Sequence, residues 1–309
     1  MERNRIHERL GSRHARSFII SLIILTVIIL SGLLWQFVSI LPVGRITIVA
    51  AGEAMTVLSW DGERGKLGVI VIPADVRVEG IYNTGELPVS SLLKLEELDP
   101  NKQGLFVGSI RDALGLPIAG VMRTVGSAGA GDAIGSLSPF SPTGWQRGSG
   151  VSVLTRFRLW WLFKNLRPDG IWAVNLEGEG VFQEKSLPDG SRARIFDTDR
   201  FDLVAGSRLE TDSIRREMTR VLIINTTDAS GLGGRVARTF GRAGMVVVAV
   251  ESDHPAIPGC TLHANKEMWD LHAVQFIRQE YACVLREEGT DERADVTVRL
   301  GDSNAKQYE

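Results

Sequence analysis

Apolar and polar positions form blocks whose spacing changes along the chain. Residues 17–44 carry no charged side chain and are mostly Ile, Leu, Val and Phe. After this segment the apolar runs are short and polar turns separate them. β-Branched runs predict strands over 45–51, 54–60 and 67–72, and helical spacing predicts helices over 89–98 and 105–114. This mixture of strands and helices predicts an α/β (α+β) fold class.

The middle of the chain is less regular. Residues 124–150 are rich in glycine and serine, which predicts a long functional loop or a linker. Residues 151–167 predict an apolar, basic helix. We favour a core helix, because a predicted strand over 171–176 follows directly; a helix on a membrane surface is the alternative. Residues 181–196 predict a hairpin.

The stretch from Val221 to Glu251 predicts a strand, a helix over 231–243 that ends at Gly244, and a second, buried strand over 245–250. Gly231, Gly233 and Glu251 form part of a dinucleotide-binding fingerprint. However, Val236 stands where the third glycine of that fingerprint belongs. A dinucleotide-binding domain is therefore only a remote alternative.

The uncharged segment is long enough to cross a bilayer, since about 20 apolar residues suffice. We expect a transmembrane helix over 17–42, preceded by a cytoplasmic basic tail over 1–16 that holds five arginines. The positive-inside rule then places the remaining residues outside the cytoplasm, in a single-pass protein of the cell membrane. A cleaved signal peptide is the rival interpretation, but its apolar region is usually shorter.

Overall charge and cysteine content exclude some partners. The net charge of −2 and the pI of about 6.3 give no general reason to expect a nucleic-acid partner. The two cysteines, Cys260 and Cys283, permit a disulfide outside the cytoplasm, although two separate small buried residues is the interpretation we favour. Neighbouring histidines match no zinc spacing, so no metal site and no cofactor are predicted from them.

The stretch after residue 220 resembles the C-terminal domain of LytR–CpsA–Psr cell-envelope proteins. The resemblance rests on four short segments: VLIINTT at 221–227, GL at 231–232, RVA at 235–237 and GMVV at 244–247. Thr226 departs from the glycine usual in that pattern. The resemblance implies a LytR C-terminal-like domain over 216–309.

The preceding region resembles a degenerate LytR–CpsA–Psr domain over 45–215. Its matching segments are EAMTVLSWD at 53–61, IPADVRV at 72–78, and YNTG at 82–85 before the predicted helix. The resemblance implies two small extracytoplasmic α/β domains on one anchor. It also implies bacterial cell-wall biogenesis, with a cell-wall polymer, a lipid-linked glycan or an envelope protein as partner.

Intact members of this family resemble phosphotransferases that move glycopolymers from polyprenyl pyrophosphate to peptidoglycan. That chemistry uses arginines against the pyrophosphate and carboxylates on a divalent metal. Here Ala51 and Ala74 stand where arginines are expected, which favours a non-catalytic binding or scaffold protein. The alternative is a divergent transferase with Glu53 and Asp75 on Mg²⁺ and Arg77, on the same face as Asp75, in place of a lost arginine.

Overall fold

The chain separates into two units, residues 1–42 and 43–309. The computed structural model describes residues 21–22, 24–27, 31–32, 44–52, 54–124, 130–138, 151, 153–174, 176–187, 190–287, 291–306 and 308. Within the first unit, residues 21–22, 24–27 and 31–32 are helical, and the rest of the predicted membrane helix lies outside the described residues. Among the described residues, no single helix has both the length and the apolar character needed to span a bilayer.

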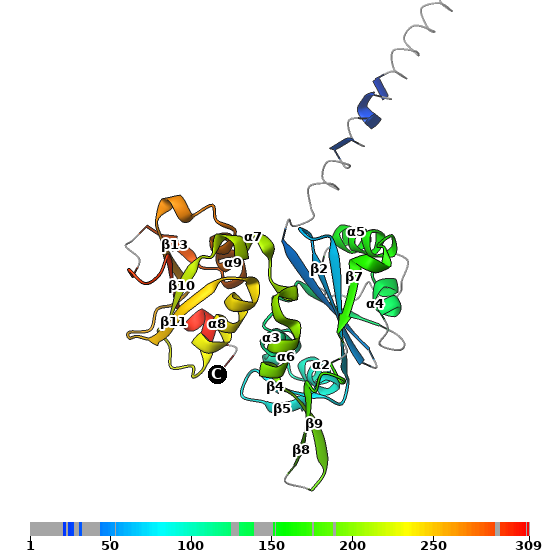
Figure 1. Cartoon of the computed structure of the whole chain (residues 1–309), viewed down its shortest axis with the longest axis horizontal. Helices are drawn as coiled ribbons and strands as arrows, with labels where there is room; N and C mark the ends of the chain where they lie inside the picture. Colours follow the sequence, from blue (N-terminus) through cyan, green and yellow to red (C-terminus); the bar gives the residue numbers. More distant parts are fainter. Residues whose placement is uncertain are drawn as a thin grey trace, which may run out of the picture. The chain divides into compact units, whose positions relative to one another are not determined.

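The second unit begins with a five-stranded sheet in the order β6-β1-β2-β3-β7 (Figure 1). β1 (Arg45–Ala51), β2 (Ala54–Asp61) and β3 (Lys66–Pro73) form an antiparallel meander, which confirms the three predicted strands. β6 (Gly120–Arg123) and β7 (Ile171–Val174) pair in parallel with its two edges. These five strands build the centre of what we call the first lobe.

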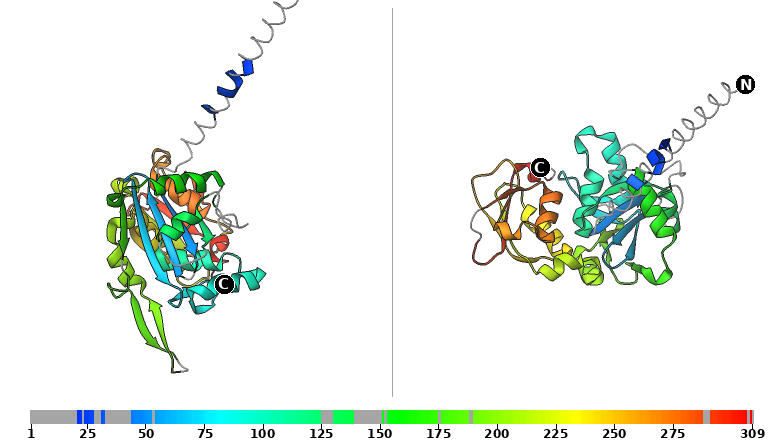
Figure 2. Two further views of the ribbon diagram at one scale, coloured as in Figure 1. Left: turned by 90° about the vertical axis from the view of Figure 1, so that its right-hand side faces the viewer. Right: turned by 90° about the horizontal axis from the view of Figure 1, so that it is seen from above.

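Helices cover both faces of this sheet (Figures 1 and 2). The two predicted helices are confirmed as α2 (Val89–Leu98) and α3 (Leu105–Leu114). They cover one face of the sheet, where Met55 and Val57 of β2 belong to the same core. Trp60 points to the opposite face and stacks on Phe163 of α5 (Val153–Lys164). α4 (Ala130–Ser136) lies within the predicted glycine- and serine-rich loop, whose residues 125–129 and 139–150 lie outside the described part.

A smaller sheet extends the first lobe, in the order β5-β4-β9-β8. β4 (Arg77–Gly80) and β5 (Gly85–Pro88) pair antiparallel, and β8 (Phe182–Ser186) with β9 (Arg192–Phe196) forms the predicted hairpin. α6 (Thr198–Ala205) follows and buries Phe201 in the same core. Short 3₁₀ turns complete the connections, at Pro100–Lys102, Pro168–Gly170 and Gly206–Leu209.

A second core belongs to the sheet β11-β10-β14-β12-β13, which we call the second lobe. Its strands are β10 (Arg220–Asn225), β11 (Val246–Ser252), β12 (Thr261–Ala264), β13 (Val284–Arg286) and β14 (Val296–Leu300). α8 (Leu232–Ala243) and α9 (His272–Tyr281) contribute to one shared core. Three short helices flank it: α7 (Asp212–Glu217), the 3₁₀ turn Lys266–Met268 and α10 (Asp302–Ala305).

Two predictions for the second lobe were wrong. β11 is not a buried strand: it lies at the sheet edge with β10 as its neighbour, so Val246, Val248 and Val250 remain largely exposed. Cys260 and Cys283 are buried as predicted, but they form a disulfide. Their Cα atoms lie 4.4 Å apart because parallel pairing of β12 with β13 brings the two residues side by side. The predicted domain boundary between residues 215 and 216 stays a prediction.

Candidate functional site

A cavity of about 440 Å³ opens where β1 ends and β2 begins. We call it the strand-end cavity. Its walls are mostly apolar, and polar side chains from α2 and from the end of β6 complete it. The lining residues are Ala51, Gly52, Ala54, Met55, Ala74, Val89, Ser90, Leu93, Lys94, Glu97, Phe106, Arg123 and Thr124.

Local sequence explains why this space remains open. Ala51, Ala54 and Ala74 have short side chains, so the strand ends leave a hollow that α2 and α3 do not fill. Met55 and Phe106, both buried in the first core, contribute apolar lining. Backbone bonds fix the start of α2 here, because the amides of Val89 and Ser90 donate to the carbonyls of Val76 and Ala74.

The charged groups of this cavity come from two elements. Arg123 ends β6, whose parallel pairing with β1 places it beside Ala51, and it forms an ion pair with Glu97 of α2. Lys94 lies one helical turn before Glu97 on α2 and is exposed. Within the described part of the chain, Lys94 makes no ion pair. A cavity with apolar walls and two cations suits an amphiphile whose polar end is anionic.

The predicted catalytic residues are not gathered in this cavity. Glu53 lies outside the described residues, between Gly52 and Ala54, which do line it. The carboxylate of Asp75 is 63% exposed and accepts two hydrogen bonds from Arg194 of β9, at 2.8 and 2.5 Å. These bonds hold the pKa of Asp75 below its usual value. Arg77 starts β4 and pairs with Pro88 and Ile195, so it also lies towards β9.

The described residues contain no cluster of three or more His, Cys, Asp or Glu side chains that could hold a metal ion. The Mg²⁺ of the transferase alternative would need Asp75, whose carboxylate is committed to Arg194. The roles suggested for Glu53, Asp75 and Arg77 stay predictions.

Sequence reasoning missed the cations that this cavity does contain. Arg123 is the last residue of β6, and Lys94 lies in the predicted helix over 89–98. An arginine at the end of a strand could have marked a binding site, but only the parallel pairing of β6 with β1 places Arg123 beside Ala51. In contrast, Ala51 and Ala74, which the resemblance singled out, both line the cavity.

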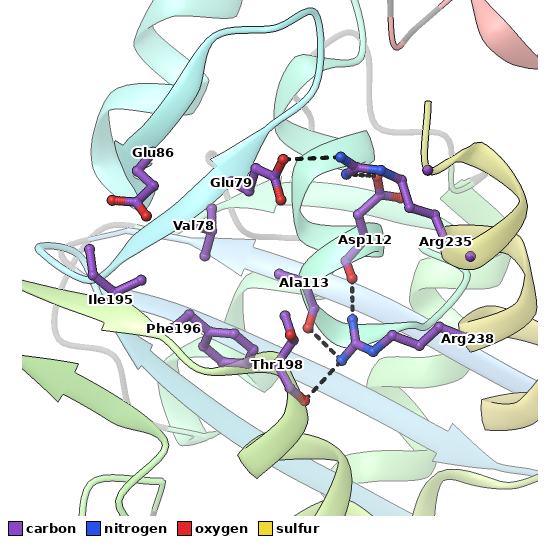
Figure 3. A pocket seen from close by; sticks show the side chains of 12 residues that line it. Val78, Glu79, Glu86, Asp112, Ala113, Ile195, Phe196, Thr198, Arg235 and Arg238 are labelled. Carbon is purple, nitrogen blue, oxygen red and sulfur yellow. Dashed lines mark hydrogen bonds and ion pairs between the residues drawn. The ribbon is translucent and has the colours of Figure 1, made fainter. Parts of the chain in front are cut away.

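A second cavity, of about 430 Å³, lies between the two lobes (Figure 3). Arg235 of α8 bonds to Glu79 and Asp112 at 3.1 Å each. Arg238, one turn later, donates to the carbonyl of Ala113 at 3.0 Å and also bonds to Asp202. Both guanidiniums therefore hold α8 of the second lobe against the first lobe.

This arrangement argues against the dinucleotide alternative. The two arginines of the cavity that contains Gly231 and Gly234 are already paired: Arg235 with Glu79 and Asp112, and Arg238 with Asp202, which leaves neither guanidinium unpaired for a pyrophosphate. Gly233 serves packing instead, because a Cβ atom there would come within 2.5 Å of the side chain of Val250. The glycines of this stretch thus allow α8 to start and to lie close to β11.

No protein-family model and no curated protein matches the chain. Solved structures do match. TagT bound to LIIa-WTA gives a TM-score of 0.37 at 10% identity, over 52% of this chain and 88% of that one. YwtF (TagT), a LytR-CPS2A-psr family protein with bound octaprenyl pyrophosphate lipid, gives 0.37 at 11%, over 52% and 87%. TagV of B. subtilis gives 0.34 at 12%, over 53% and 95%. The likeness to LytR–CpsA–Psr proteins thus covers about half of the chain at a modest TM-score.

Proposed function

We propose that this chain is a membrane-anchored envelope protein that binds a lipid-linked, phosphate-bearing glycopolymer in the strand-end cavity without transferring it. The observation that carries this proposal is the composition of that cavity: apolar walls, with Arg123 and Lys94 as its cations. Burial of apolar surface favours the hydrocarbon of a lipid carrier. The two cations favour its phosphate.

Two observations favour binding over transfer. Ala51 and Ala74 line the cavity where the family resemblance expects arginines, so two sources of positive charge are missing. The one arginine that lines the cavity among the described residues, Arg123, already forms an ion pair with Glu97. A cavity with fewer free guanidiniums stabilises the charge that develops during phosphoryl transfer less well. Transfer of the glycopolymer to peptidoglycan remains the alternative function.

The cellular setting belongs to the same proposal. Residues 17–42 anchor the chain in the cell membrane, and residues 1–16 lie in the cytoplasm. The folded unit then lies outside, where lipid-linked glycans and cell-wall polymers are found. One of the solved structures named above holds octaprenyl pyrophosphate, which has the chemistry proposed here.

Binding of a polyprenyl pyrophosphate analogue to the full chain in detergent tests the proposal. Because a charge-assisted hydrogen bond contributes about 1.5–3 kcal/mol, we expect Arg123→Ala to weaken binding by about tenfold or more. Glu97→Gln should tighten binding, since it releases Arg123 and removes a negative charge beside the cavity. Titration calorimetry measures both affinities.

Arg192→Ala is the matched control, because Arg192 is an exposed arginine of the β8–β9 hairpin that pairs with Glu184. Its affinity should equal that of the unmodified chain. Equal affinities for all three variants would contradict the assignment of the cavity. Transfer of labelled glycan to peptidoglycan by the unmodified chain would instead favour the transferase, and loss of that transfer in Glu53→Ala would identify its acid.

A further inference from the structure

α5 presents an aromatic face that the first core does not use. Its buried residues include Leu159 and Phe163. Val153, Phe157, Trp160, Trp161 and Lys164 recur at the spacing of a single helix face, away from those two residues. Val153 is 47% exposed and Trp161 is 56% exposed. Phe157 and Trp160 are half-buried, so Val153 and Trp161 supply most of the exposed apolar surface of this face. Two exposed apolar side chains beside two half-buried rings on one helix are a typical sign of an interaction site.

Aromatic contacts order this face. The rings of Phe157 and Trp160 lie 5.8 Å apart, and those of Trp160 and Trp161 lie 6.4 Å apart. The ammonium group of Lys164 lies 5.1 Å from the centre of the Trp160 ring. The face therefore combines a continuous aromatic surface with a cation at its C-terminal end.

The fold places α5 at the end of the sheet where β1 begins (Figures 1 and 2). Phe163 stacks on Trp60 at 5.8 Å, and Trp60 is the register partner of Ile46 near the start of β1. At the same end, Asp61 of β2 is the register partner of Arg45 in β1 and of Lys66 in β3. β7 also starts there, with Ile171 opposite Leu67.

Four exposed cations belong to this end: Lys66, Lys164, Arg167 and Arg208. Lys66 opens β3, Arg167 follows α5, and the Arg208 guanidinium lies 5.9 Å from the centre of the Trp172 ring. None of the four forms an ion pair with another residue that the structure describes. The exposed Asp169 lies in the same cavity as Lys66 and Arg208, so the four cations leave an excess of positive charge for an external anion.

The length of the connecting chain limits how far this end can lie from the proposed anchor. The anchor ends at residue 42 and β1 starts at Arg45. Three residues span at most about 10 Å, so the start of β1 must stay close to the bilayer surface if residues 17–42 cross it. This step rests on the proposed membrane anchor.

We infer that this end of the folded unit docks on the bilayer itself, with the aromatic face of α5 in the interface and the four cations on the phosphates of anionic phospholipids. Tryptophan favours this position because its ring is apolar and its N–H is polar. Lysine and arginine side chains can bury their stems in the interface and keep their charge at the headgroups. Each basic residue near an anionic surface contributes roughly a fivefold gain in attachment.

Spin labels on the full chain, reconstituted in vesicles of phosphatidylglycerol and phosphatidylcholine, test this inference. The described residues hold no free cysteine, because Cys260 and Cys283 form the disulfide, so a single added cysteine can be labelled. Val153→Cys places a label on the α5 face and keeps both tryptophans. Leu203→Cys, at a 76% exposed residue of α6, is the matched control. We expect the label at 153 to be more accessible to oxygen than to a water-soluble nickel complex, and the label at 203 to show the reverse.

Two changes should move the label at 153 into water: Trp160→Ser with Trp161→Ser, and replacement of all four cations by glutamine. Vesicles of phosphatidylcholine alone should also reduce its immersion. A label at 153 that reports water in an anchored chain would overturn the docking. Spin–spin broadening between labels at 153 would overturn it too, since it would assign the face to a second copy. If alkaline carbonate released the chain from the vesicles, the anchor itself would fail.

Discussion

Replacement of Asp202 by alanine should destabilise the folded unit by about 2–3 kcal/mol, because it leaves the buried guanidinium of Arg242 and the partly buried one of Arg238 without their carboxylate. Asp202 of α6 accepts hydrogen bonds from Arg238 at 2.7 and 2.6 Å, and it also pairs with Arg242. The Arg242 side chain is only 6% exposed, and burial lowers its pKa. Urea unfolding of the full chain, followed by circular dichroism, measures the change.

Asp199→Ala is the control for this prediction. Asp199 lies on the same helix, is exposed, and takes part in no ion pair among the described residues. Its replacement removes only a favourable charge in the first turn of α6, so it should change the free energy of unfolding by less than about 1 kcal/mol. If Asp202→Ala were as mild as Asp199→Ala, the ion pairs between α6 and α8 would not stabilise the fold.

Loss of the Cys260–Cys283 disulfide should destabilise the second lobe by about 3 kcal/mol, since the bond closes a loop of moderate length. The two cysteines are separated by 23 positions, and the segment between them contains β12 and α9. The double variant Cys260→Ala and Cys283→Ala removes the bond and keeps small apolar side chains at both sites. Thermal unfolding with and without dithiothreitol measures the effect.

Dithiothreitol should lower the unfolding temperature of the unmodified chain and leave that of the double variant unchanged. The same unfolding temperature for both chains in the absence of dithiothreitol would show that the disulfide does not limit stability. A response of the double variant to dithiothreitol would point to an effect unrelated to these cysteines.

Local signals explain which elements the sequence could predict. The strands of the meander, the β8–β9 hairpin and helices α2, α3 and α8 are confirmed because each depends on spacing within its own segment. Gly244 ends α8 in the left-handed conformation, as its position predicts, and Gly115 ends α3 in the same way. α5 is also confirmed, although it is shorter than the predicted range of 151–167.

Long-range pairing explains what the sequence could not predict. A run of valines predicts a strand, but only the order of the sheet decides that β11 lies at an edge. The cysteine pairing depends on β12 lying beside β13. In the strand-end cavity, two alanines followed from the family resemblance, whereas Arg123 required the pairing of β6 with β1, two strands that are far apart in the sequence.

The contact of Arg238 with the end of α3 has a consequence for how the chain matures. Arg238 donates to the carbonyls of Asp112 and Ala113 in the last turn of that helix, so a residue of the second lobe caps a helix of the first. A ribosome releases residue 112 long before residue 238. During synthesis, the carbonyls at the end of α3 must therefore bind water until the later segment has been made. In a newly made chain, the last turn of α3 would therefore gain its side-chain cap only when the second lobe folds against the first lobe.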